Sequence, residues 1–328
     1  MTIRARVLAV AAVLTLAVSA SALAQAGAPA QQSGATGIQV QKLADGVWAA
    51  TPSNGANVGW FLLGDGVVAV DSGGDAAMAK DILKQIAETT GNKPVRLLIM
   101  THAHADHSSG ARAFVAAGAR ILCQESIAGQ MLAFVTQPTN DPNDPLSGKA
   151  GIRPVVESIS ERSIMVDGIH NAQVYYLGAA HSAGDLVVYL SGDKILFSGD
   201  LALNGRQPFM QSPDVDPAGW ERSLQSLSRV PVDKLVPGHG DIGPTAGIQD
   251  SLAYVSRVNA LAKKFVDSGT RDDMLDAMIR APENAIPNVP LSDAHIANLK
   301  AAVKAVRDKA AKKATTPAAA PPAPTPAK

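Results

Sequence analysis

An apolar strand that ends in a cluster of histidines is the feature that most constrains this chain. The segment "VRLLIM" is predicted to be a buried strand, and it runs directly into "THAHADHSSGA". Three of the chain's seven histidines lie in this motif, at His102, His104 and His107, with Asp106 between them. His102 and His104 are two residues apart, so they project to the same side of an extended segment. Asp106 and His107 follow after a bend and can face a second, adjacent metal position.

One loop cannot supply all the ligands of a metal site, so further ligands are expected downstream. His181 lies in "LGAAHSAGD", Asp200 in "ILFSGDLAL" and His239 in "LVPGHGD". Each of them follows an apolar strand, as the first motif does, and small residues flank each one. Imidazole nitrogens and carboxylate oxygens suit zinc well, and iron or manganese less exclusively. The spacing therefore predicts a metal site where several strand ends meet.

The remaining pattern predicts two strand-rich blocks that each carry helices. Short apolar runs separated by Gly and Asp turns occupy the region before residue 73, with Gly64-Asp65-Gly66 as the clearest hairpin turn. The segment from Asp75 to Gly91 has helical periodicity and a glycine stop. A second series of strands and a helix lie between Asn171 and Asp241. Two such blocks predict an α/β fold in which two sheets pack face to face with helices outside.

The N-terminus is typical of a cleavable export signal. Arg4 and Arg6 precede the apolar run "VLAVAAVLTLAVSA", and Ala22 and Ala24 form an A-x-A cleavage site. We expect the cut before Gln25, which leaves no membrane span and makes the protein periplasmic or secreted.

Composition divides the rest of the chain. The signal peptide at 1–24 precedes a small-residue leader at 25–37, and a Pro/Ala-rich tail at 310–328 is predicted to be disordered. Between them we predict a catalytic domain at 38–246 and a helical extension at 247–309. Within the domain, the segment Ser126–Asp167 is the least regular part. The formal net charge is zero and aromatic residues make up only 4% of the chain, which weighs against a nucleic-acid partner.

Several single residues have a structural interpretation. Cys123 is the only cysteine, which excludes an intramolecular disulfide, and its strand context predicts a place in the core. His170 and His295 match no motif and are expected on the surface. Asp193, in "SGDKI", is interpreted as a hairpin-turn residue.

The ordered motifs resemble those of the metallo-β-lactamase superfamily, whose signature is H-x-H-x-D-H followed by a His, an Asp and a final His. The resemblance covers roughly Val40 to Gly240, and all four motifs occur in order. It implies an αββα four-layer sandwich, here with a helical C-terminal extension. The strand in "VVAVDSG" also resembles a family strand that ends in an aspartate, here Asp71, which would orient the histidine loop from behind the ligands.

The resemblance also implies a ligand set for two metal ions. His102, His104 and His181 should bind the first ion, whereas Asp106, His107 and His239 should bind the second. Asp200 matches the aspartate that bridges both ions in hydroxyacylglutathione hydrolase-like members. Two Zn²⁺ per chain are expected, with iron or manganese as alternatives. The catalytic residue would be Asp106, which would orient a hydroxide activated by the two ions. Ser108 and Ser109 are interpreted as helix-entry residues rather than nucleophiles.

The expected function is an exported metal-dependent hydrolase that cleaves an ester, thioester, lactone or amide bond of a small molecule. Familiar β-lactamases of this family have Cys or Ser where this chain has Asp200, which favours other hydrolases. Glutathione thioesters, however, are mainly cytosolic, so the substrate stays open. The alternatives are a periplasmic β-lactamase, an iron-dependent sulfur dioxygenase and a non-catalytic accessory protein of the same fold.

Substrate selectivity is expected in two places, the segment Ser126–Asp167 and the loop "NGRQPFMQSPDVDP" after Asp200. Phe209, Met210 and Trp220 are interpreted either as pocket contacts or as ordinary packing residues.

Overall fold

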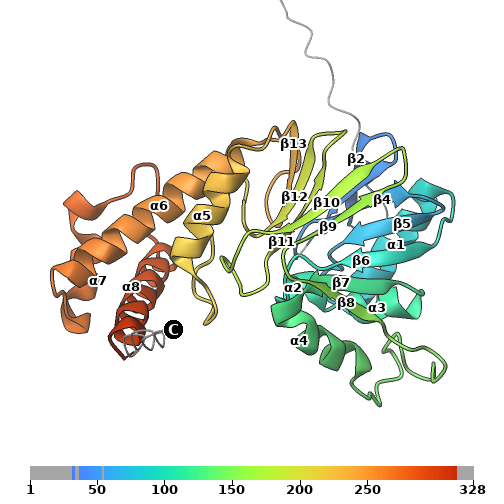
Figure 1. Ribbon diagram of the computed structural model, residues 1–328, viewed down its shortest axis with the longest axis horizontal. Coiled ribbons are helices and arrows are strands. Elements are labelled where there is room, and N and C mark those ends of the chain that lie inside the picture. Colours follow the sequence, from blue (N-terminus) through green and yellow to red (C-terminus); the bar gives the residue numbers. More distant parts are fainter. Residues whose placement is uncertain (1–31, 34–36, 54, 316–328) are drawn as a thin grey trace, which may run out of the picture. The chain divides into compact units, whose positions relative to one another are not determined.

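The computed structural model describes residues 32–33, 37–53 and 55–315, and the structural statements below concern these residues. The predicted signal peptide, most of the leader and residues 316–328 of the tail lie outside them. Strands of the described part form two separate sheets (Figure 1).

The first sheet has eight strands that lie side by side in chain order. They are β1 (Gln32–Ser33), β2 (Gln39–Ala44), β3 (Val47–Thr51), β4 (Val58–Leu63), β5 (Gly66–Val70), β6 (Val95–Ile99), β7 (Arg120–Gln124) and β8 (Val156–Ile159). The strands are antiparallel from β1 to β5 and parallel from β5 to β8. The predicted turn at Gly64-Asp65 joins β4 to β5, because Leu63 pairs with Gly66.

The second sheet has five strands in the order β13-β12-β11-β10-β9. They are β9 (Arg162–Val166), β10 (Asn171–Tyr176), β11 (Leu186–Leu190), β12 (Ile195–Gly199) and β13 (Lys234–Pro237). Neighbours are antiparallel except β12 and β13, which are parallel.

The helices fall into two groups along the chain. Those that follow the first strands are α1 (Ala76–Thr90), α2 (Ala105–Ser108), α3 (Ala111–Ala116) and α4 (Glu125–Thr136). The later ones are α5 (Pro217–Leu227), α6 (Ala246–Asp267), α7 (Asp272–Arg280), the 3₁₀ helix η1 (Pro282–Asn284) and α8 (Asp293–Thr315). The predicted helix after Asp75 is confirmed as α1: the Asp75 carboxylate caps its start, and Gly91 ends it in the left-handed conformation with φ 66°. None of the described helices has both the length and the apolar character that crossing a membrane requires.

Three buried clusters separate four layers. Phe61, Ile99 and Phe197 belong to the cluster between the two sheets. A second cluster packs α1, α3 and α4 against the outer face of the first sheet. A third packs α5 to α8 against the second sheet, around Trp220 and Leu299. Figure 1 shows these two helix groups beside their respective sheets. The arrangement is the predicted αββα sandwich, with the C-terminal helices added to its second helical layer.

One local prediction was right only in part and another was wrong. Within the segment Ser126–Asp167, residues 137–155 have no helix or strand, as predicted, but the segment also contains most of α4 together with β8 and β9. Ile127, Met131 and Val135 recur every four residues and bury one face of α4. Ser108 and Ser109 end the short helix α2 instead of starting it, since their N–H groups donate to the carbonyls of His104 and Ala105.

The predicted surface positions of His170 and His295 were also wrong, because both are buried. His170 Nδ1 lies 2.9 Å from the Asp193 carboxylate, which occupies the predicted hairpin turn. His295 Nδ1 lies 3.1 Å from the Tyr254 hydroxyl. The partner of each histidine comes from a distant segment. No local sequence pattern therefore indicated that a hydrogen bond would offset the cost of burying the polar ring. Cys123 is buried in β7 as predicted, and α8 continues to Thr315, past the expected end of the extension.

Candidate metal centre

The candidate ligands gather where strands of both sheets end. Asp71 directly follows β5, and the histidine loop follows the parallel strand β6. Asp200 directly follows β12, and His239 follows the parallel strand β13. His181 lies in the turn between β10 and β11. Parallel neighbours end at the same edge of a sheet, so this topology brings together side chains that are far apart in the sequence.

The structure brings all seven predicted ligands into three overlapping groups. Within each group, one nitrogen or carboxylate oxygen per residue lies within 4.8 Å of the others. The groups are His102, His104 and His181; Asp106, His107 and His239; and His102, His107 and Asp200. The third group shares members with the first two, so the set forms one continuous centre with two halves.

The Asp200 carboxylate faces both halves of the centre. Its Oδ2 atom lies 3.5 Å from His181 Nε2 and 3.6 Å from His239 Nε2. Its Oδ1 atom lies 3.4 Å from His107 Nε2. One carboxylate that reaches a histidine of each half has the placement that a ligand shared by two cations requires.

Two closer contacts occur within the halves. His104 Nδ1 lies 2.8 Å from His181 Nε2 in the first half. In the second half, Asp106 Oδ2 lies 3.0 Å from His239 Nε2. Ligand-type atoms therefore converge on the same small volume in each half.

Unpaired buried atoms test whether a metal fits this centre. In the described part of the chain, four buried side-chain nitrogen or oxygen atoms have no hydrogen-bond partner. Three of them are His102 Nε2, His107 Nε2 and Asp200 Oδ1, all within the centre. Buried polar atoms are normally paired, and a cation would satisfy all three. The donor set of imidazole nitrogens and carboxylate oxygens fits zinc.

The electrostatic setting favours the neutral form of two histidines in the first half, His102 and His181. Burial, with the neighbouring His107, holds the pKa of His102 well below its usual value. Burial likewise lowers the pKa of His181 to about 4. Neutral imidazole is the form that binds metal, so these two side chains need not lose a proton first.

The carboxylates of the centre are held ionised. Burial alone would raise the pKa of Asp200, but His107 and His181 outweigh it and hold that pKa well below the usual range. A hydrogen bond to His239 lowers the pKa of Asp106. Burial would lower the pKa of His107, yet Asp200 and Asp71 together hold it well above its usual value. The ionised carboxylates of Asp106 and Asp200 therefore attract positive charge to the centre.

The outer ring nitrogens of four histidines have partners behind the centre. The Asp71 carboxylate lies 2.8 Å from His107 Nδ1 and accepts hydrogen bonds from the N–H and hydroxyl of Thr101, each at 2.8 Å. The Thr101 hydroxyl in turn lies 3.0 Å from His102 Nδ1. With only these outer nitrogens protonated, Nε2 of both histidines is an acceptor that faces the centre; His107, whose pKa is raised, would give up its Nε2 proton to a bound cation.

The loop after Asp200 holds the other two. His181 Nδ1 lies 3.2 Å from the Phe209 carbonyl oxygen, and His104 Nε2 lies 2.8 Å from Ser212 Oγ. Partners of this kind select the tautomer and orientation of a ligand histidine.

Several residues that position the ligands were not among the predicted site residues. Thr101 and Ser212 are two of them, and Asn57 is a third. The Asn57 amide donates to the carbonyls of Pro237 and Gly240, each at 2.9 Å, and so holds the turn that carries His239. Neither Asn57 nor Ser212 lies in a recognisable motif.

Gly238 lies so close to Asp200 that a Cβ atom there would come within 1.9 Å of the carboxylate. The glycines around His239 were the one local signal of this close packing.

An open cavity of about 500 Å³ lies over the centre. It is lined by His104, Ala105, Asp106, His181, Asp200, Leu203, Arg206, Gln207, Phe209, Ser212 and His239. The loop after Asp200 contributes to this lining as expected, but Ser126–Asp167 contributes no residue to it. Phe209 is half exposed there, whereas Met210 and Trp220 are fully buried packing residues. The Trp220 ring packs edge-on against His181 at 5.2 Å.

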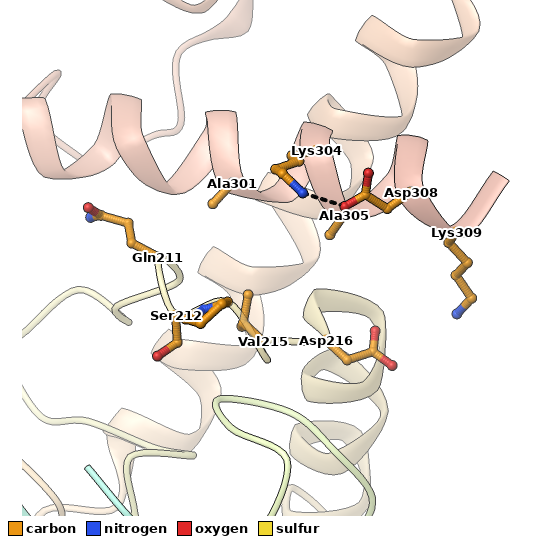
Figure 2. Close-up of a pocket in the computed structure, with 10 residues that line it drawn as sticks. Gln211, Ser212, Val215, Asp216, Ala301, Lys304, Ala305, Asp308 and Lys309 are labelled. Atoms are coloured by element: carbon orange, nitrogen blue, oxygen red, sulfur yellow. Dashed lines mark hydrogen bonds and ion pairs between the residues drawn. The ribbon is translucent and has the colours of Figure 1, made fainter. Parts of the chain in front are cut away.

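A second cavity, of about 510 Å³, adjoins the first through Ser212, which lines both. Figure 2 shows its two walls, the segment from Gln211 to Asp216 and the α8 residues Ala301, Lys304, Ala305, Asp308 and Lys309. Helix α8 therefore lies directly beside the loop that contacts the centre.

Comparison with known proteins identifies related chains. Residues 54–239, which include all seven candidate ligands, match the metallo-beta-lactamase superfamily. The chain is 22% identical over 286 residues to a linear primary-alkylsulfatase of Pseudomonas sp. (strain ATCC 19151), covering 74% of this chain and 53% of the relative. It thus spans about half the length of that relative. It is 26% identical over 234 residues to a type 2 metallo-beta-lactamase of Elizabethkingia meningoseptica, covering 67% of this chain and 85% of the relative.

A solved structure, a metallo-beta-lactamase from Pontibacter korlensis, has the same fold. It aligns with a TM-score of 0.55 at 23% identity and covers 67% of this chain and 99% of its own.

Proposed function

Because this chain belongs to the metallo-beta-lactamase superfamily, we propose that it is an exported hydrolase that uses two zinc ions to cleave an ester, thioester, lactone or amide bond. The family is metal-dependent, usually with zinc, and its members act as hydrolases on small molecules. The observation that carries the proposal is the pair of ligand groups joined by Asp200 at the base of an open cavity.

In this proposal His102, His104 and His181 would hold the first ion, and Asp106, His107 and His239 would hold the second. Asp200, which faces both groups, would serve as a ligand to both. When bound, two zinc ions lower the pKa of a water molecule toward neutrality and polarise the substrate's electrophilic centre.

The chain's own catalytic group is Asp106. It lines the cavity, is partly exposed and has a lowered pKa, so its carboxylate can orient the attacking water by accepting a hydrogen bond. Ser108 is unsuited to act as a nucleophile because its hydroxyl donates to the Ala103 carbonyl at 3.2 Å.

Substrate choice falls to the cavity lining. Arg206 and Gln207 offer donors to an anionic or polar substrate group, and Phe209 offers an exposed ring. A β-lactamase is the second candidate, because several curated relatives carry that name. It ranks behind the other hydrolases because this chain has Asp200 where Cys or Ser is expected in such β-lactamases.

Removal of metal tests the proposal. Zinc-loaded protein should hydrolyse at least one member of a panel of nitrocefin, an acyl thioester, an aryl ester, a lactone and an alkyl sulfate. Chelation should lower that rate by on the order of a hundredfold or more, and added zinc should restore it. His104→Ala should act like chelation, whereas His170→Gln, at a buried histidine that pairs with Asp193, should keep two zinc ions per chain.

Three results would contradict this function. Intact hydrolysis by His104→Ala excludes the centre as the active site. One iron per chain supports the sulfur dioxygenase alternative. Two bound zinc ions without turnover of any panel member support a non-catalytic accessory protein.

Export is proposed from the sequence of residues 1–24, which lie outside the described part of the chain. Expressed with its native N-terminus in a Gram-negative host, the protein should accumulate in the periplasm and begin at Gln25. Retention of the full N-terminus in the cytoplasm, measured by mass spectrometry of cell fractions, would contradict export.

A further inference from the structure

The C-terminal helix α8 is hydrogen-bonded to the loop beside the candidate metal centre through the buried side chain of Asn298, and we propose that Asn298 is a positioning residue for the first metal position. It acts by fixing the loop that orients His104 and His181. The inference rests on the proposed metal-binding function of the centre.

Asn298 holds the loop by its backbone on both sides of Phe209. Its amide group donates to the Pro208 carbonyl at 2.7 Å, and its carbonyl accepts from the Met210 N–H at 3.0 Å. Asn298 is only 1% exposed, so water cannot replace these bonds without a rearrangement. The peptide that carries the Phe209 carbonyl is therefore clamped from α8.

The clamped segment contacts two ligands of the first half. The Phe209 carbonyl lies 3.2 Å from His181 Nδ1, and Ser212, a few residues on, lies 2.8 Å from His104 Nε2. A displacement of the loop would remove the partners of both outer nitrogens at once. Each ring could then rotate or shift its proton to the nitrogen that faces the centre, where a metal needs a lone pair.

The other ligands are held by different segments. Thr101 and Asp71 contact the outer nitrogens of His102 and His107, and Asn57 holds the turn of His239. None of these contacts passes through α8 or through the clamped residues 208–212. Asn204, the first residue of the loop, also donates its N–H to the His239 carbonyl at 3.2 Å, but it precedes the clamped stretch. Loss of Asn298 should therefore weaken the first position and leave the second unchanged.

The side chain of Asn298 uses all its hydrogen-bonding groups. Besides Pro208, its amide donates to the Tyr254 hydroxyl at 2.9 Å, and that hydroxyl lies 3.1 Å from His295 Nδ1. The two amide hydrogens and the carbonyl are thus all used, and α6 is tied to the same network. This role gives the C-terminal helices a function at the centre beyond covering the second sheet.

The test measures zinc affinity at each position separately. In a His239→Ala background, which leaves the first group complete, Asn298→Ala should weaken zinc binding 10- to 100-fold. In a His102→Ala background, which leaves the second group complete, the same substitution should change affinity less than twofold. With cobalt in place of zinc, the visible spectrum of the first position should change and that of the second should not.

Asn284→Ala is the matched control. Asn284 is equally buried in the helical extension, where its side chain bonds to Met278 and Lys264 rather than to the loop. It should lower the unfolding temperature as Asn298→Ala does, yet leave both zinc affinities unchanged. If Asn298→Ala fails to fold, Ser212→Ala removes one bond at the far end of the path and should weaken the first position alone.

Equal weakening of both positions, or unchanged affinity at the first, would overturn the inference. These readouts need no substrate, so they are distinct from the test of the hydrolase. Selective loss of zinc in a protein that hydrolyses no substrate would refute the proposed activity and support the role of Asn298.

Discussion

Replacement of Asp200 by alanine should lower hydrolysis by on the order of a thousandfold, equivalent to about 4 kcal/mol of transition-state stabilisation. The carboxylate reaches histidines of both halves at 3.4 to 3.6 Å, so its removal takes a ligand from both proposed ions. It also removes the main negative charge that the buried histidines share. Metal analysis and kcat/KM on the best panel substrate measure the effect, and fewer than two zinc ions per chain are expected.

The control for this substitution lies in the same sequence. Asp193 shares the triplet Ser-Gly-Asp with Asp200, but it sits in a hairpin turn and pairs with His170. Asp193→Ala should therefore reduce stability slightly and leave metal content unchanged. The Asp200→Ala variant could instead bind two zinc ions tightly and keep activity within tenfold of the wild type. That result would show that Asp200 is not a shared ligand.

The substitution Asp71→Asn should lower the zinc affinity of the second metal position 10- to 100-fold, with a parallel loss of activity. The two Asp71 oxygens accept hydrogen bonds from the Thr101 N–H on one side and from the Thr101 hydroxyl and His107 Nδ1 on the other. An amide has only one oxygen, so the NH₂ group of the new asparagine must face a donor on one side. If the NH₂ group faces His107, it donates to Nδ1 and favours the tautomer protonated on Nε2. In that tautomer the nitrogen that faces the centre has no lone pair for a metal.

Zinc titration and the pH dependence of kcat/KM measure this effect. Asp75→Asn is the matched control, because Asp75 caps α1 and asparagine caps a helix equally well. Near-native folding with a weakened second position is the expected result for Asp71→Asn. Unchanged zinc affinity at both positions would mean that Asp71 only braces the backbone of Thr101.

Much of the centre could be predicted from the chain because its residue types and their order are local information. Four of the seven candidate ligands lie in one short segment, and the other three each follow an apolar run. The strand that precedes each motif is visible as hydrophobicity, and parallel strand ends share an edge. The same reasoning failed for His170 and His295, which are buried beside partners from other segments, Asp193 and Tyr254.

The positioning residues could not be predicted in this way. Asn57, Thr101, Ser212 and Asn298 are common polar residues, and their contacts span the fold. The bond from Asn298 to Met210 joins residues that are 88 positions apart. No spacing rule predicts such a pair, because the pairing depends on how α8 packs beside the loop.

The sequence by itself determined which side chains can bind metal, the strands that present them and the family to which the chain belongs. Hydrophobic periodicity and ligand chemistry act over short stretches, so they can be read without coordinates. Only the tertiary structure decided which nitrogen of each histidine faces the centre, that Asp200 reaches both halves, and that α8 supports the first. Those features depend on hydrogen bonds between distant segments, which form only when the two sheets and the C-terminal helices pack together.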